Sequence, residues 1–136
     1  NTERLKEIIA EYGWPGKSLV GKEAANGAWL LAQHADYDLE FQKQALKFLQ
    51  ESVVNGDAEK INEAYLVDRV RVNTGQPQDF GTQIYQNEKG WFGPRPMEDV
   101  EHVEERRKQF SLEPFSDYQK LMEKNHKKLG GKEKQN

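Results

Sequence analysis

Residues 22–35, KEAANGAWLLAQHA, decide how the rest of the chain is arranged, because they include the longest apolar run, Ala28 to Ala32. As a helix, this segment would be apolar on most of its circumference. A helix of that kind belongs in the middle of a helical protein. We therefore expect a central helix from Lys22 to about Ala35, with the other elements packed around it.

The neighbouring segments 2–12, 38–54 and 57–74 repeat apolar residues at helical spacing on one side. Asp38 and Asp57 stand where N-caps are expected, and glycines or Thr74-Gly75 follow the helix ends. We expect three amphipathic helices here. The second and third are separated by a short turn and should pack antiparallel.

Residues 75–96 have a different character, because glycines and prolines interrupt an aromatic, β-favouring stretch. We predict strands at Thr82–Gln86 and Gly90–Phe92 with a turn at Asn87–Lys89, which together form a small hairpin insertion at about residues 80–93. A hairpin of this size must lean on helices to be stable.

Two further helices are expected at 98–109 and from Phe115 to about Lys128, and residues 130–136 should be disordered because they contain no apolar side chain. The prediction is a mainly α protein: a compact bundle of about five to six helices with one small β-hairpin insertion. Because 136 residues is a common size for one domain, we assign residues 1–129 to a single helical domain.

The composition excludes several classes of protein. A net charge of −3 makes nucleic acid a poor partner, and a longest apolar run of five residues is too short to span a membrane. The absence of cysteine removes disulfides and thiol chemistry. Because the chain begins at Asn1, we expect an upstream segment to be missing, so both cytoplasm and periplasm remain open.

Two short motifs do not indicate cofactors. Gly16-Lys17-Ser18 matches the end of a phosphate-binding loop, but Glu11 stands where the first glycine is required. Asp99 and His102 share a helical face, yet only one copy of this carboxylate–imidazole pair exists and its neighbours are acidic. We predict no metal site, and no motif specifies a cofactor or an oligomeric state.

His34 follows Gly27, Leu30 and Leu31 at helical spacing, which predicts that its imidazole points inward. With Asp36 nearby, His34 could act as an oriented general base or as a metal ligand, and we count it as a candidate general base. The alternative is a structural histidine that stabilises the end of a helix.

Asp68 lies on the stripe of Ile61, Tyr65 and Val72, so its carboxylate should face the core. A buried carboxylate needs a cation or a set of backbone donors. Arg69, Arg107 and His34 are among the candidate partners, and both a structural salt bridge and a functional carboxylate are open.

The loop that follows, Gly75-Gln-Pro-Gln-Asp-Phe-Gly-Thr-Gln83, contains three glutamines. Neutral amides suit recognition of a polar ligand, and glycines allow close approach of the backbone. We therefore count Gln76, Gln78 and Gln83, with Arg69 and Arg107, as candidate binding residues. Alternatively, the loop covers the core, with Phe80 as its plug.

The chain resembles a bacterial family that is known only as a domain of unknown function, over roughly residues 13–118. The resemblance rests on Gln33-His-Ala-Asp36, Tyr65-Leu-Val-Asp-Arg-Val70, the Gly75–Gln83 loop and Pro96-Met-Glu-Asp-Val-Glu-His-Val-Glu-Glu-Arg-Arg107. It implies a shared fold but no activity, and exported relatives favour the cell envelope slightly.

Three functions are consistent with these residues. The first is binding of a small polar ligand or a peptide in a pocket formed by the helix ends and the Gly/Gln-rich loop. The second is a hydrolase-like or lyase-like enzyme with His34 as general base, assisted by Asp36 or Asp68 and by an arginine. The third is a purely structural or protein-interaction domain.

Overall fold

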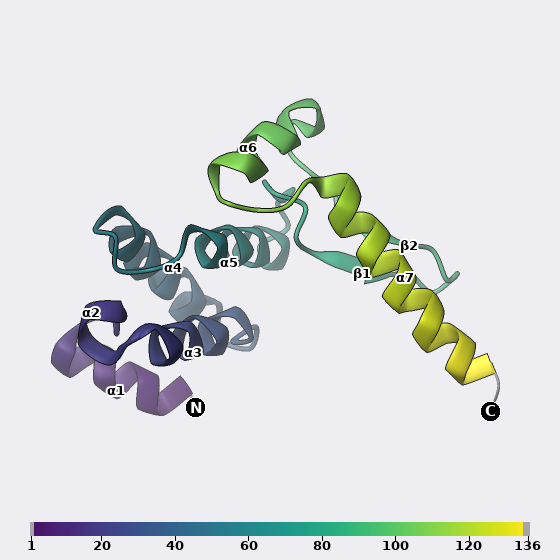
Figure 1. Cartoon of the computed structure of the whole chain (residues 1–136). Coiled ribbons are helices and arrows are strands. Elements are labelled where there is room, and N and C mark those ends of the chain that lie inside the picture. The colour runs from purple at the N-terminus through teal and green to yellow at the C-terminus, as the bar shows by residue number, and fades with distance from the viewer. Residues whose placement is uncertain (1, 135–136) are drawn as a thin grey trace.

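A computed structural model describes residues 2–134, and its elements confirm a mainly α protein with one antiparallel hairpin (Figure 1). In chain order they are α1 (Thr2–Tyr12), α2 (Lys17–Val20), α3 (Lys22–Gln33), α4 (Leu39–Val54), α5 (Lys60–Asn73), β1 (Ile84–Gln86), β2 (Phe92–Pro94), the 3-10 turn η1 (Val100–His102), α6 (Val103–Gln109) and α7 (Phe115–Lys134).

α3 occupies the central position predicted for residues 22–35 and packs against α1, α2, α4 and α5. Its inward stripe consists of alanines, Ala25, Ala28 and Ala32. Because alanine side chains are short, they let the neighbouring helices approach closely. Leu49 of α4 and Leu66 of α5 fill the space around them and complete the main core.

α5 is buried on more than one side and separates two clusters of apolar side chains. Leu66 belongs to the main core with α3 and α4, whereas Ala64 packs with Phe80 and Leu112 in a second, smaller core. This position explains why its apolar residues do not form a single stripe. α5 therefore connects the α1–α4 bundle to the rest of the chain.

The hairpin is present as predicted, although its second strand lies about two residues later than expected. Tyr85 pairs with Gly93. Figure 1 shows α7 running beside the hairpin and away from α1. On the face toward α7, Phe92 stacks on His126 at 4.2 Å between ring centroids, which gives the hairpin the support that its small size requires.

The structure corrects the expected caps and ends of two helices. Asp57 does not cap α5; its carboxylate accepts hydrogen bonds from the amide of Ser18 at 2.6 Å and from its hydroxyl at 2.9 Å. It therefore holds the start of α2, a helix that was not predicted. α7 continues to Lys134, beyond its expected end near Lys128. Residues 135–136 lie outside the described part of the chain, so disorder of the tail stays a prediction.

Among residues 2–134, no helix combines the length and the apolar character that crossing a membrane requires.

Removal of the Asp57 carboxylate should destabilise the α2 turn. We expect Asp57→Ala to lower the free energy of unfolding by about 1 kcal/mol, as for other lost helix caps. Asp57→Asn, which keeps one acceptor oxygen, should lose less. Urea denaturation of the two variants measures both values, and equal losses would show that the carboxylate does not act as a cap.

Candidate functional site

Asp68, on the third turn of α5, is fully buried, as its position on an apolar stripe predicts. Its Oδ1 accepts hydrogen bonds from the amides of Asp79 at 2.8 Å and Phe80 at 3.0 Å, and its Oδ2 accepts from the amide and hydroxyl of Thr82 at 2.9 and 2.8 Å. Such charge-assisted bonds offset the cost of burying the carboxylate. Burial raises the pKa of Asp68, and the four donors oppose that rise. One carboxylate thus fastens the Gly/Gln-rich loop to α5.

Gln78 is also fully buried and holds the same loop in shape. Its side-chain nitrogen donates to the backbone carbonyls of Gln83 at 3.0 Å and Arg95 at 2.8 Å. Its side-chain oxygen accepts from the backbone N–H of Gln83 at 2.9 Å. Both donors of the Gln78 side chain are therefore used within the protein.

Phe80, in the same loop, is buried in the second core, with its ring centroid 4.7 Å from that of Phe110.

Arg69 follows Asp68 on α5 and joins the loop to the segment after α3. Its guanidinium makes a two-pronged ion pair with Asp36, with Nε 2.9 Å from Oδ1 and Nη2 bonded to Oδ2. Nη1 donates to the side-chain oxygen of Gln83 at 3.0 Å, and the side-chain nitrogen of Gln83 donates to the Thr82 hydroxyl at 2.9 Å. Because Thr82 also binds Asp68, a continuous line of hydrogen bonds connects Asp36 to Asp68.

Two amide side chains complete the surroundings of Asp36. Asn73 donates to its carboxylate at 2.7 Å, and the buried Gln42 donates at 3.4 Å. The Arg69 guanidinium and then these amides, against the opposing effect of burial, lower the pKa of Asp36 to about 2. Asp36 is thus an ionised acceptor near neutral pH, not a proton carrier.

Arg107, on α6, is buried behind the loop with 1% of its surface exposed. Nη1 donates to the Phe80 carbonyl at 2.6 Å and Nε to the Glu113 carbonyl at 2.8 Å, while the guanidinium lies 5.1 Å from the Tyr118 ring centroid. Burial lowers the pKa of Arg107. Among the described residues, the hydrogen bonds to Asp68 come from the loop and not from a cation.

His34 lies outside this network. α3 ends at Gln33, His34 is its C-cap, and the side chain of His34 is exposed. The prediction that the His34 imidazole points inward is wrong, because the alanine stripe faces the core, whereas Gly27 and Leu30 lie on the outer side of α3.

Gln76 is exposed too, and its side-chain nitrogen donates to the Thr74 hydroxyl at 3.1 Å.

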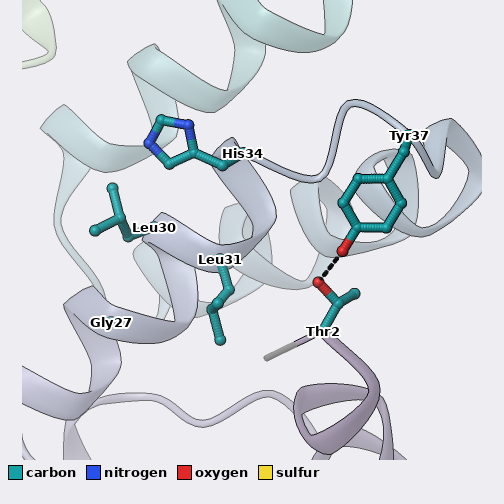
Figure 2. A pocket seen from close by; sticks show the side chains of 6 residues that line it. All are labelled: Thr2, Gly27, Leu30, Leu31, His34 and Tyr37. Carbon is teal, nitrogen blue, oxygen red and sulfur yellow. Dashed lines mark hydrogen bonds between the residues drawn. The ribbon is translucent and has the colours of Figure 1, made fainter.

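Figure 2 shows where His34 lies instead, on the wall of a cavity of about 440 Å³. The Thr2 and Tyr37 hydroxyls hydrogen-bond each other at this cavity. In the described part of the chain, the His34 imidazole has no hydrogen-bond partner, so its nitrogens are open to a ligand. No residue of the Gly/Gln-rich loop lines the cavity. Its lining consists of Thr2, Gly27, Leu30, Leu31, His34 and Tyr37.

Sequence reasoning missed Gln42, although a signal for it existed. Gln42 precedes Ala45 by three residues and Leu49 by seven, so it lies on the same inward stripe of α4. A polar residue on such a stripe indicates a buried hydrogen bond, as it did for Asp68. Tyr37 and Thr2 gave no such signal, because only the packing of α1 brings them together.

The Asp68 carboxylate should be required for stability. Asp68→Asn keeps the shape but places an NH₂ group where donors now point, so we expect the free energy of unfolding to fall by about 2–4 kcal/mol. Urea denaturation measures the loss, and the exposed Gln76→Ala is the control, with an expected change within about 0.5 kcal/mol. A loss no larger than that of the control would contradict this account.

The low pKa of Asp36 predicts a specific acid response. A depressed carboxylate pKa stabilises the fold above the unfolded value of 3.8, and this contribution is lost as pH falls to about 2. Asp36→Asn should therefore unfold at a lower temperature than the parent at neutral pH, and the gap should narrow below pH 3.8. Thermal unfolding at a series of pH values tests this; a constant gap down to about pH 2 would refute the lowered pKa.

Comparison with known proteins agrees with the resemblance noted in the sequence. The model of a family of unknown function, DUF6624, matches residues 1–130, which include the Asp68 network and the cavity at His34. No curated protein and no solved structure matches the chain. The chain therefore belongs to this family of unknown function.

Proposed function

We propose that this domain binds a small molecule in the cavity at His34. Its volume of about 440 Å³ falls in the range of ligand sites, roughly 300–1,000 Å³. Leu30 and Leu31 provide an apolar wall, and His34 and the Tyr37–Thr2 hydroxyl pair provide hydrogen-bonding groups. This lining suits a ligand with an apolar body and one polar group.

Gly27 is the observation that carries this proposal. A glycine inside a helix costs about 1 kcal/mol relative to alanine. A Cβ at Gly27 would meet no atom within 4 Å, and the backbone of Gly27 does not have a positive φ. Neither packing within the chain nor backbone conformation explains the glycine. It does keep the α3 wall of the cavity open about two helical turns before His34.

The Gly/Gln-rich loop, which the sequence favoured as the ligand site, serves in this proposal to stabilise the fold and not to bind the ligand. Gln78 and Gln83 are engaged in hydrogen bonds to the protein, as are Arg69 and Arg107. An enzyme with His34 as general base gains less support. Asp68 is fully engaged by the loop, and no carboxylate orients the imidazole among the described residues.

Leucine at position 27 should fill the cavity without harming the fold. We expect the free energy of unfolding of Gly27→Leu to equal that of the parent or to be slightly higher, because leucine is the better helix former. Its binding of phenol, indole or cyclohexanol, detected by amide shifts at residues 27–37 in ¹H–¹⁵N spectra, should weaken at least tenfold.

Glu23→Leu is the matched control, since it places the same side chain on α3 at a residue that does not line the cavity. It should leave probe binding unchanged. If no probe shifts the amides of residues 27–37, or if both variants bind the probes equally, the cavity is not a ligand site.

A further inference from the structure

We infer that the ligand is an anionic amphiphile, an alkyl carboxylate whose tail extends along α3 into a second cavity. This inference rests on the proposed function and specifies its ligand class. Three properties of the walls support it: the second cavity adjoins the first, polarity changes along the pair, and no described residue that lines either cavity carries a carboxylate.

The second cavity has a volume of about 280 Å³ and lies between α1, the end of α2 and the stretch of α3 from Ala24 to Leu31. It shares Gly27 and Leu31 with the cavity at His34. Because Gly27 has no side chain, the two cavities adjoin where α3 has least bulk. From Ala24 to the C-cap His34 the two walls follow ten residue steps along α3, about 15 Å at a helical rise of 1.5 Å per residue. An elongated ligand fits this shape better than a round one.

The two cavities differ in polarity. Besides Arg4, the second is lined by apolar residues and Gly27: Leu5, Ile8, Pro15, Val20, Ala24, Gly27, Ala28 and Leu31. The hydrogen-bonding groups of Thr2, His34 and Tyr37 are confined to the first. A ligand that uses both must therefore have an apolar tail and a polar head, with the head beside His34.

The charged groups favour an anionic head. Among the described residues, Arg4 and His34 are the basic members of the two linings, and no aspartate or glutamate belongs to either. Arg4 is 2.9 Å from Glu7 in an ion pair, whereas His34 has no partner among the described residues. The imidazole N–H can donate to a carboxylate, and so can the one hydroxyl hydrogen of the Thr2–Tyr37 pair that is not used between the two groups. A cationic head would meet no acidic side chain among the described residues of these linings.

A chain-length series tests the inference on the complete 136-residue chain. We would titrate butanoate, hexanoate, octanoate and decanoate below their micelle concentrations and follow the amides of residues 24–37. Affinity should rise about fourfold for each buried methylene until the second cavity is full. Ala24→Phe, which fills that cavity, should abolish the rise and leave butanoate binding unchanged. Glu23→Phe is its matched control and should keep the full rise.

The outcomes separate this inference from the proposed function. If phenol or butanoate binds in a Gly27-dependent way but affinity does not grow with chain length, the second cavity is not a tail site and the inference fails alone. If octanol binds as tightly as octanoate, the inference that the ligand has an anionic head group is contradicted. If neither the acids nor the uncharged probes shift these amides, both the inference and the proposed function fail.

Discussion

The carboxylate of Asp68 connects the two halves of this domain. Asp68 belongs to α5, which completes the core of α1–α4, and its oxygens hold three residues of the loop that leads to the hairpin. The same short segment is bound from the other side. Arg107 of α6 donates to the Phe80 carbonyl, and the Tyr118 hydroxyl of α7 donates to the Thr82 carbonyl at 2.8 Å. The position of α6 and α7 relative to the bundle thus depends on this loop, together with the second core in which Ala64 of α5 packs with Phe80 and Leu112.

This constraint changes where a function is to be sought. Asp36, Arg69 and Gln83 have the composition of an active site, but they bind one another and extend the Asp68 network to the end of α3. Residues that are engaged in this way suit a rigid frame. The open groups lie on the opposite, outer side of α3, where His34 has no hydrogen-bond partner within residues 2–134 and Gly27 leaves a gap in the cavity wall. The hydrogen bonds from Asp36 through Arg69 and Gln83 hold the end of α3, and thereby the position of His34.

Much of the fold could be predicted from the sequence because helices, caps and turns are local. α1, α3, α4 and the hairpin follow from spacing and from glycine. The burial of Asp68 was predicted correctly, although Ile61 of the same predicted stripe is exposed. The partner of Asp57 could not be predicted, since Ser18 is distant in the chain. The direction of His34 was mispredicted because α3 is apolar on most sides, so apolarity alone does not identify the face that the alanines bury. The cavity depends on how α1 packs, which no local pattern specifies.

Native-state hydrogen exchange tests the role of Asp68 most directly, because three of its four hydrogen-bond donors are backbone amides. If the carboxylate joins the two halves, the amides of Asp79, Phe80 and Thr82 should exchange only on global unfolding, at the same rate as amides in the middle of α5. Exchange of these three amides as fast as those of the exposed hairpin turn would contradict the account, because the loop would then open while the bundle stays folded.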